Sequence, residues 1–472
     1  MQDKEKKLAH NTIIFIIGSL GSKFIQFFLV PFYTWSMSTA EFGSGDIVLT
    51  MSEILVPVFS LSISDGLLRF GLDKTLRQEN VLKCCLCIDC IGAIISIFCI
   101  PIFELYHGLS QWLALFLTIM ILRIYRDYFS IYLKINDKNR MYAIDGILYT
   151  FTLCIFGILL LSIFKLGVKG YLLSYVIANL VSIIFLLIVG KPIKKIKSGH
   201  LDKKLFKDIV RYSIPMVANA MAWWIITASD RLVIQYFMSN DAVGLYSVSS
   251  KIPTIISTFS GVFLQAWAIS CITEYDSDRD KIFYQKIFDQ YYSVMIFVAT
   301  ILIAIIRPFM HVYVSPSFEC AWEYTPVLIS AAVYSGIFGY FGVIYAAAKN
   351  SINVTITTCL GAACNMLLNI LLIPCIGIQG AAIATYISWL ITSIVRIIDT
   401  RKFIAFKINY AKCFFMMTMN IIQCVCVVKL PLKYSIMISA ACILTLYYIN
   451  KNIINGFIIA TLNRIKAILG VR

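Results

Sequence analysis

Charged residues are scarce in this sequence. Asp, Glu, Lys and Arg make up 14% of its 472 residues, whereas a soluble protein carries about 25%. Such a chain cannot cover a normal water-exposed surface, which excludes a large soluble enzyme, a disordered protein and a secreted disulfide scaffold. The sequence also has no glycine-rich phosphate loop ending in Gly-Lys-Ser or Gly-Lys-Thr, which argues against a transporter driven by its own ATPase.

Metal ligands are few or badly placed. There are only four His, and most of the 15 Cys lie inside apolar runs, where a thiol behaves as a small hydrophobe. Cys84, Cys87 and Cys90 have the spacing of a zinc or iron–sulfur site, but no further Cys or His clusters near them in the sequence. We therefore expect apolar packing there, with neither a metal nor a cofactor.

Long hydrophobic runs dominate what is present. Hydrophobic residues make up 60% of the chain and its mean hydropathy is +0.82. About 20 apolar residues are needed for a helix to cross a bilayer. Fourteen runs qualify: 12–34, 47–67, 84–106, 112–133, 143–164, 170–190, 212–238, 244–270, 288–308, 325–348, 354–374, 378–399, 410–430 and 434–454. These runs are continuous rather than alternating, so we predict an all-α polytopic membrane protein and not a strand barrel.

The basic residues predict the orientation. The net charge is +16, and 31 of the 41 Lys and Arg lie in or beside the loops of one side, against 5 on the other side. Cytoplasmic loops carry the excess of Lys and Arg, so both termini are expected in the cytoplasm. The longest basic run, 191–211, has no aromatic motif for nucleic acid, and we interpret it as a connector that contacts anionic lipid.

An internal repeat divides the chain. Met37-Ser38 with Gly43 matches Met238-Ser239 with Gly244, Lys138-Asn139 matches Lys349-Asn350, and Gly167 with Gly170 matches Gly377 with Gly380. The offsets of 201 to 211 residues predict two parallel six-helix repeats, which flank a central cavity in several transporter folds. We expect an N-terminal lobe at 1–190, a linker at 191–211, a second lobe at 212–400, and a helical hairpin with a cytoplasmic tail at 401–472.

Five cations fall deep within the predicted spans, away from the span ends. A charge at the centre of a membrane helix costs about 2.5–3.5 kcal/mol, so such groups usually face the bundle interior or water. We expect these residues to bind an anionic substrate, since guanidinium matches phosphate oxygens in pairs. They are Lys23, Arg123, Arg126, Arg231 and Lys251.

A structural role for these cations stays open. Arg123 could pair with Asp127 one helical turn later, Asp230 could pair with Arg231, and Lys251 could extend to an interface. For Lys23, the alternative to substrate binding is an ion pair with Glu53. Acids within spans are also the usual sites of proton or sodium coupling, and Glu53 and Asp89 are the two candidates.

The order of several short motifs resembles one family. These motifs are Ile17-Gly18-Ser19-Leu20-Gly21-Ser22-Lys23, Glu41-Phe42-Gly43, Ser64-Asp65-Gly66, Tyr212-Ser213-Ile214-Pro215, Ser229-Asp230-Arg231, Val243-Gly244-Leu245-Tyr246-Ser247, Asn365 with Asn369, and Gly377 with Gly380-Ala381-Ala382. Together they resemble the bacterial polysaccharide transporters, the O-antigen or capsule repeat-unit flippases of the multidrug/oligosaccharidyl-lipid/polysaccharide exporter superfamily.

The resemblance implies a function and a location. It implies a flippase, not an enzyme, in the bacterial plasma membrane, which moves undecaprenyl-pyrophosphate-linked oligosaccharides to the outer leaflet by alternating access. Membrane lipids, a polysaccharide polymerase and a chain-length regulator are the implied partners. A cation-coupled multidrug exporter of the same superfamily is the alternative. A membrane-embedded glycosyltransferase is disfavoured because the predicted outer loops are short.

Overall fold

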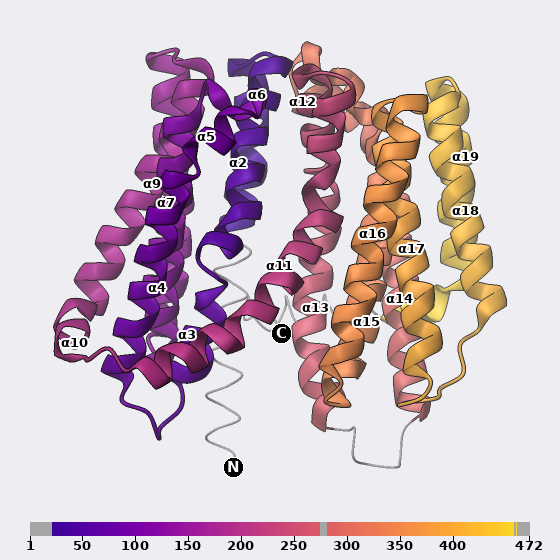
Figure 1. Cartoon of the computed structure of the whole chain (residues 1–472). Helices are drawn as coiled ribbons and strands as arrows, with labels where there is room; N and C mark the ends of the chain where they lie inside the picture. Colours follow the sequence, from indigo (N-terminus) through magenta and orange to yellow (C-terminus); the bar gives the residue numbers. More distant parts are fainter. Residues whose placement is uncertain (1–20, 274–280, 457–458, 460–472) are drawn as a thin grey trace, which may run out of the picture. The chain divides into compact units, whose positions relative to one another are not determined.

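The computed structural model describes residues 21–273, 281–456 and 459 of the chain. Within these residues every regular element is a helix (Figure 1). The chain packs as two compact units, one up to Ser247 and the other from Val248 onward. The elements of the first unit are residues 21–36, α2 (Thr39–Phe59), α3 (Ile63–Gly71), α4 (Gln78–Phe98), α5 (Ile100–Glu104), α6 (His107–Ser110), α7 (Leu113–Ile135), α8 (Asn139–Ile158), η1 (Leu159–Ile163), α9 (Gly167–Gly190), α10 (Pro192–Ser198), α11 (Lys203–Phe237) and the greater part of α12 (Asn240–Ser249).

The second unit is built in the same way from long helices. It holds α13 (Pro253–Thr273), α14 (Lys281–Tyr313), η2 (Pro316–Glu323), α15 (Thr325–Ala347), α16 (Ser351–Ile376), α17 (Ile378–Thr400), α18 (Tyr410–Lys429) and α19 (Leu432–Ile449). α15 packs against α13 and α17 and is the centre of this unit, while α18 and α19 pack on each other and on α14.

Twelve of the described helices are long and apolar enough to cross a membrane. The predicted all-helical, multi-pass membrane fold is therefore confirmed. Of the other two predicted spans, 112–133 is the helix α7, which contains Arg123, Arg126 and Asp127. The span 12–34 is helical from residue 21, and its first nine residues lie outside the described part.

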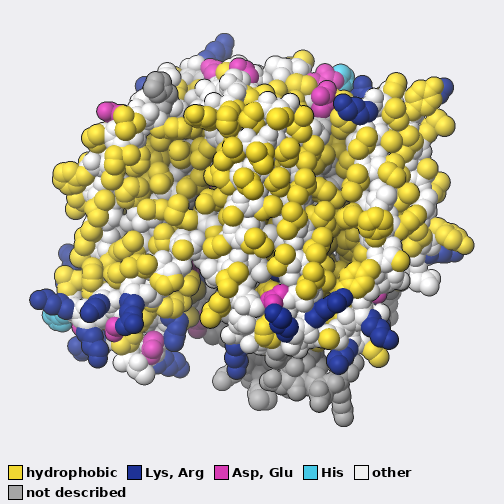
Figure 2. Space-filling model, turned by 45° about the vertical axis from the view of Figure 1, so that its right-hand side comes forward, with side chains coloured by type: hydrophobic (Ala, Val, Ile, Leu, Met, Phe, Trp, Pro, Cys, Tyr) yellow, Lys and Arg dark blue, Asp and Glu magenta, His cyan; other side chains and the backbone are white. Residues whose placement is uncertain are grey.

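Apolar side chains cover the middle of the surface. Figure 2 shows hydrophobic side chains over the centre of the visible face and Lys and Arg gathered along one edge. On α4, for example, Ile94 and Phe98 are 53% and 79% exposed. Patches this apolar are stable only against lipid or a partner, which agrees with a membrane-spanning protein.

Three predicted segments differ from the observed helices. The predicted span 47–67 is interrupted, because α2 ends at Phe59 and α3 begins at Ile63, with Leu61 and Ser62 at φ of 50° and 49° between them. Pro57, inside the last turn of α2, removes one helical donor and crowds the preceding turn. The predicted span 244–270 is likewise broken at 250–252, before Pro253 begins α13.

The third difference concerns the basic segment 191–211, which is mostly helical. It holds α10 and the first turns of α11. Asp202 caps α11, since its Oδ1 accepts hydrogen bonds from the backbone N–H groups of Lys204 and Leu205 at 2.8 and 3.2 Å. α11 then runs for 35 residues with Pro215 in its interior, and it bends along its length (Figure 1).

Glycines of the matched motifs occupy corresponding places. Gly167 begins α9 and Gly377 directly precedes α17. Their φ angles are 53° and 62°, a conformation that favours glycine. A Cβ on Gly170 would lie 3.0 Å from the carbonyl oxygen of Leu160, and one on Gly380 would lie 2.5 Å from that of Leu372. In each half, glycine thus allows a helix to approach the backbone that precedes it.

Candidate functional site

The three arginines of the predicted site all lie in the first unit, and each meets a carboxylate on another helix. Arg123 on α7 donates a hydrogen bond from Nη1 to Oε1 of Glu53 on α2 at 2.7 Å. The two side chains are 33% and 32% exposed. This pair is the most exposed of the three.

Arg126 is held by several groups at once. Its Nε donates to Ser182 Oγ on α9 at 2.8 Å, and its Nη2 lies 3.3 Å from Asp145 Oδ2 on α8. Ser182 itself donates to Asp145 at 2.5 Å, and the guanidinium lies 3.8 Å from the ring centroid of Tyr149. The side chain of Asp145 is only 2% exposed. Arg126 therefore links α7, α8 and α9 through the several N–H donors of its planar guanidinium, which lysine lacks.

Replacing Arg126 with Lys should lower the stability of the protein. The ammonium cannot reach Ser182 and Asp145 while stacking on Tyr149, and one lost hydrogen bond to a charged group is worth about 1.5–3 kcal/mol. The free energy of unfolding in detergent should fall by roughly this amount. The exposed Arg77→Lys is the matched control, and an equal effect of both changes would contradict the assigned role.

Arg231 forms the third pair, between α11 and α2. Its Nε lies 2.6 Å from Asp46 Oδ2, with the side chains 13% and 8% exposed. Ser247 Oγ donates to the same carboxylate at 2.6 Å, and Tyr246 donates to Asp230. Arg231 also interacts electrostatically with Glu53, which joins this pair to that of Arg123.

Only part of this network could be anticipated from the sequence. Arg123 and Glu53 pair with each other, and among the described residues no ion pair joins Arg123 to Asp127 or Lys23 to Glu53. Asp46 is missing from the sequence-based candidates because α2 begins at Thr39, eight residues before the predicted span. Asp46 lies seven residues before Glu53, which places both acids on the same face of one helix. This spacing could have revealed Asp46 from the sequence.

The two predicted lysines are placed differently from the arginines. Lys23 is exposed on the helix formed by residues 21–36. Lys251 lies in the turn between α12 and α13, in the second unit. Neither forms an ion pair with another residue in the described part of the chain. Their role in substrate binding stays a prediction.

The second unit contains a buried cation that the sequence analysis overlooked. Arg396 on α17 is 2% exposed. Its guanidinium donates to Phe338 O and Thr357 Oγ1, both at 2.9 Å, and lies 3.3 Å over the ring of Phe338. Carbonyls, hydroxyls and a ring face thus hold this charge. Its position inside the predicted span 378–399 was sufficient to nominate it.

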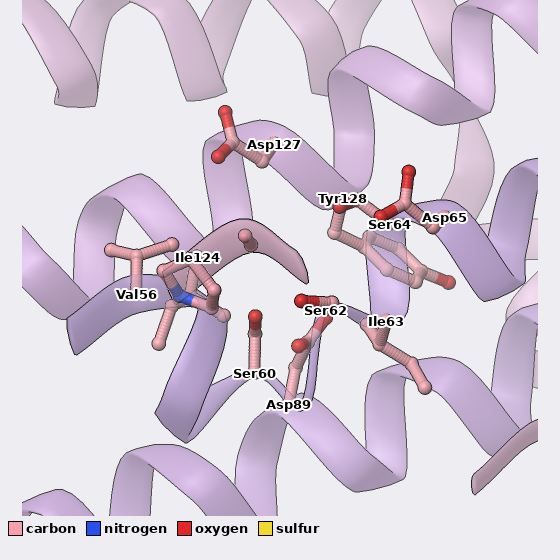
Figure 3. Close-up of a pocket in the computed structure, with 12 residues that line it drawn as sticks. Val56, Ser60, Ser62, Ile63, Ser64, Asp65, Asp89, Ile124, Asp127 and Tyr128 are labelled. Carbon is pink, nitrogen blue, oxygen red and sulfur yellow. The ribbon is translucent and has the colours of Figure 1, made fainter. Parts of the chain in front are cut away.

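The two candidate coupling acids have opposite surroundings. Glu53 is neutralised by Arg123. Asp89 on α4 is 1% exposed, and within the described part of the chain neither of its carboxylate oxygens has a hydrogen-bond partner. It lines a cavity of about 150 Å³ in the first unit (Figure 3). Of the two acids, Asp89 alone is left to be neutralised by something else.

Solved transporters share this fold. The lipid II flippase MurJ, in an inward closed conformation, matches with a TM-score of 0.70 and 16% identity, over 94% of this chain and 100% of that one. A multidrug resistance MATE family transporter of the MOP superfamily, in an inward-facing conformation, matches with a TM-score of 0.63 and 13% identity, over 85% and 95%. At these identities the likeness shows the fold.

Curated relatives come from Haemophilus influenzae. Protein 1 of the Lsg locus is 22% identical, and an uncharacterized membrane protein is 25% identical, each over 260 residues. Each match covers 53% of this chain and 62% of the relative, which is less than two thirds of either.

The family is shown by a match between the sequence and a family model. The model of the family described as "Polysaccharide biosynthesis protein" matches residues 8–269, which is more than half of the 472 residues. This chain is therefore a multi-pass membrane protein that belongs to the family described as "Polysaccharide biosynthesis protein", with a fold like that of MurJ and the MATE transporters.

Proposed function

We propose that this protein is a flippase that moves oligosaccharide repeat units linked to undecaprenyl pyrophosphate, for O-antigen, capsule or exopolysaccharide, from the cytoplasmic to the outer leaflet by alternating access. The observation that carries the proposal is the set of three arginines inside the membrane-spanning first unit. The family match and the MurJ-like fold support it.

Ion pairs offer a way to bind and release a pyrophosphate. A guanidinium held by a carboxylate presents its charge without the full cost of an isolated ion in the membrane. The pair of Arg123 and Glu53, one third exposed, is the one that a phosphate can enter, because two oxygens of a phosphate match the guanidinium fork. Arg126 and Arg231, more buried, keep α7 and α11 in place around it, and Lys23 and Lys251 remain candidates for further contacts.

The finer architecture is part of the same proposal. We infer fourteen spans, arranged as two parallel six-helix repeats at 1–190 and 212–400, followed by the hairpin of α18 and α19. The corresponding glycines in the two halves support this arrangement. The one-sided distribution of Lys and Arg supports cytoplasmic termini.

Export of cationic drugs is the second candidate function. Near the three arginines of the first unit lie five carboxylates, which are Asp46, Glu53, Asp127, Asp145 and Asp230. This excess of acid would suit a cation, and the fold is also MATE-like.

Reconstitution distinguishes the two functions. Purified protein in liposomes should speed the movement of a fluorescent undecaprenyl-pyrophosphate oligosaccharide to the opposite leaflet, measured by quenching from outside. Arg123→Ala should abolish this acceleration. Export of ethidium without any movement of the lipid would contradict the flippase and favour the exporter.

A further inference from the structure

A buried acid without a partner stands at the wall of the cavity in the first unit. Asp89 is 1% exposed, and both of its oxygens lack a hydrogen bond to any residue that the structure describes. Leaving a carboxylate ionised in such a place costs several kcal/mol. The acid must therefore be neutralised, by a cation or by a proton.

The break between α2 and α3 forms the opposite wall. The side chains of Ser60 and Ser62 line the cavity, and Ser62 Oγ also has no hydrogen-bond partner among residues 21–273, 281–456 and 459. Figure 3 shows the carboxylate of Asp89 pointing toward these two serines. Gly92, three residues after Asp89, makes this approach possible, because a Cβ there would lie 1.7 Å from the carbonyl oxygen of Phe59.

The charged groups around Asp89 are all acidic. α7 contributes Asp127 and the phenol of Tyr128, and α3 contributes Asp65. α2 contributes Val56 and Pro57, α11 contributes Ala220, and α5 and α10, which also pack on α4, contribute no lining residue. On α4 itself the thiol of Cys85 lies one turn earlier. Among the described lining residues there is no Lys, Arg or His.

We propose that the carboxyl group of Asp89 is a reversible proton-binding site, which couples proton movement to the transport proposed above. The described residues contain no group of three or more His, Cys, Asp or Glu placed to hold a metal ion, whereas a proton needs a single oxygen. Once protonated, the acid has a hydroxyl group to donate to a neighbouring serine, which removes the cost of burial.

The cavity supplies a route for the proton. Asp65 is exposed and lines the same cavity as Asp89, and a polar space of this size holds several waters. A hydronium ion that enters past Asp65 gives its proton to a carboxylate oxygen of Asp89; an O–H bond forms there and a neutral water remains. The reverse transfer restores the ion.

Asp127 connects this site to the arginines. It lines the cavity and lies on α7 one turn after Arg123 and next to Arg126, and it interacts electrostatically with both. Protonation of Asp89 removes a negative charge from this neighbourhood, so an anionic headgroup meets a more positive surface. Binding of the proton and of the headgroup then strengthen each other.

Infrared spectroscopy on the full-length protein in nanodiscs tests the proton site without any transport substrate. On titration from acid to alkaline pH, the wild type should show a protonated-carboxyl C=O band that disappears reversibly. Asp89→Asn, which keeps the shape of the neutral acid, should lose this band. Asp65→Asn removes an exposed acid of the same cavity and should keep it.

Three results would overturn the site. These are a band that survives in Asp89→Asn, a band of Asp89 that does not titrate because the acid is permanently neutral, and binding of radioactive sodium that Asp89→Asn abolishes. If the band titrates as expected but the lipid-linked oligosaccharide is not flipped, the proton site stands and the proposed substrate fails.

Discussion

Replacing Arg231 with Ala is expected to abolish polysaccharide display and to destabilise the protein. The change leaves Asp46, whose side chain is 8% exposed, without the cation 2.6 Å away. Breaking a buried ion pair in this way costs about 3–5 kcal/mol. Display is measured by lectin or antibody binding to cells that lack the native gene, and stability by thermal unfolding of the purified protein.

Two further variants separate charge from packing. The double change Arg231→Gln with Asp46→Asn removes both charges and should recover the stability but not the display. Lys23→Ala removes an exposed cation and should reduce the display at unchanged stability. Full display by the neutral pair would show that Arg231 has only a structural role.

The sequence was sufficient to place the cations in the membrane but not to find their partners. Hydropathy and the free-energy cost of a charge inside a membrane helix identify Arg123, Arg126 and Arg231 from one sequence, because both depend only on residues near one another in the chain. An ion pair such as that of Arg231 with Asp46 joins residues 185 positions apart, and it depends on how the helices pack. Local spacing instead favoured Asp127 as the partner of Arg123.

The break in α2 shows a second limit of sequence reasoning. Pro57 can distort a helix, but a proline in a membrane helix is often tolerated without a break. The break between α2 and α3 depends on how the helices pack. Gly92 on α4 leaves room for the carbonyl of Phe59, and Ser62 adopts a left-handed conformation. The polar surroundings of Asp89 follow from this break, so the sequence could nominate the acid but not its cavity.

A substitution at the crossing of α2 and α12 is the second change expected to affect stability strongly. Gly43 and Gly244, matched in the sequence repeat, lie against each other's helix within the first unit. A Cβ on Gly43 would lie 1.9 Å from the carbonyl oxygen of Asn240, and one on Gly244 would lie 2.1 Å from that of Thr39. The contact is therefore nearly symmetric, because Thr39 and Asn240 are themselves 201 positions apart.

Gly43→Ala is expected to separate these two helices. No side chain can move to relieve the overlap, since the obstructing atoms belong to the backbone, and overpacking of this kind costs about 1–3 kcal/mol or more. Separation would also strain the neighbouring contacts of Thr39 with Asp241 and of Ser247 with Asp46. Thermal unfolding should occur at a clearly lower temperature, and the display should fall with it.

A glycine with free space around it provides the control for this crossing. No atom of the described residues lies within 4 Å of a Cβ on Gly261, in the interior of α13. Gly261→Ala should therefore leave the stability unchanged or raise it by up to about 1 kcal/mol through helix propensity. Gly244→Ala should behave like Gly43→Ala, because it meets the same crossing from the other helix. If both changes are as harmless as Gly261→Ala, then α2 and α12 do not approach this closely, and the ion pair of Arg231 with Asp46 loses the contact that positions it.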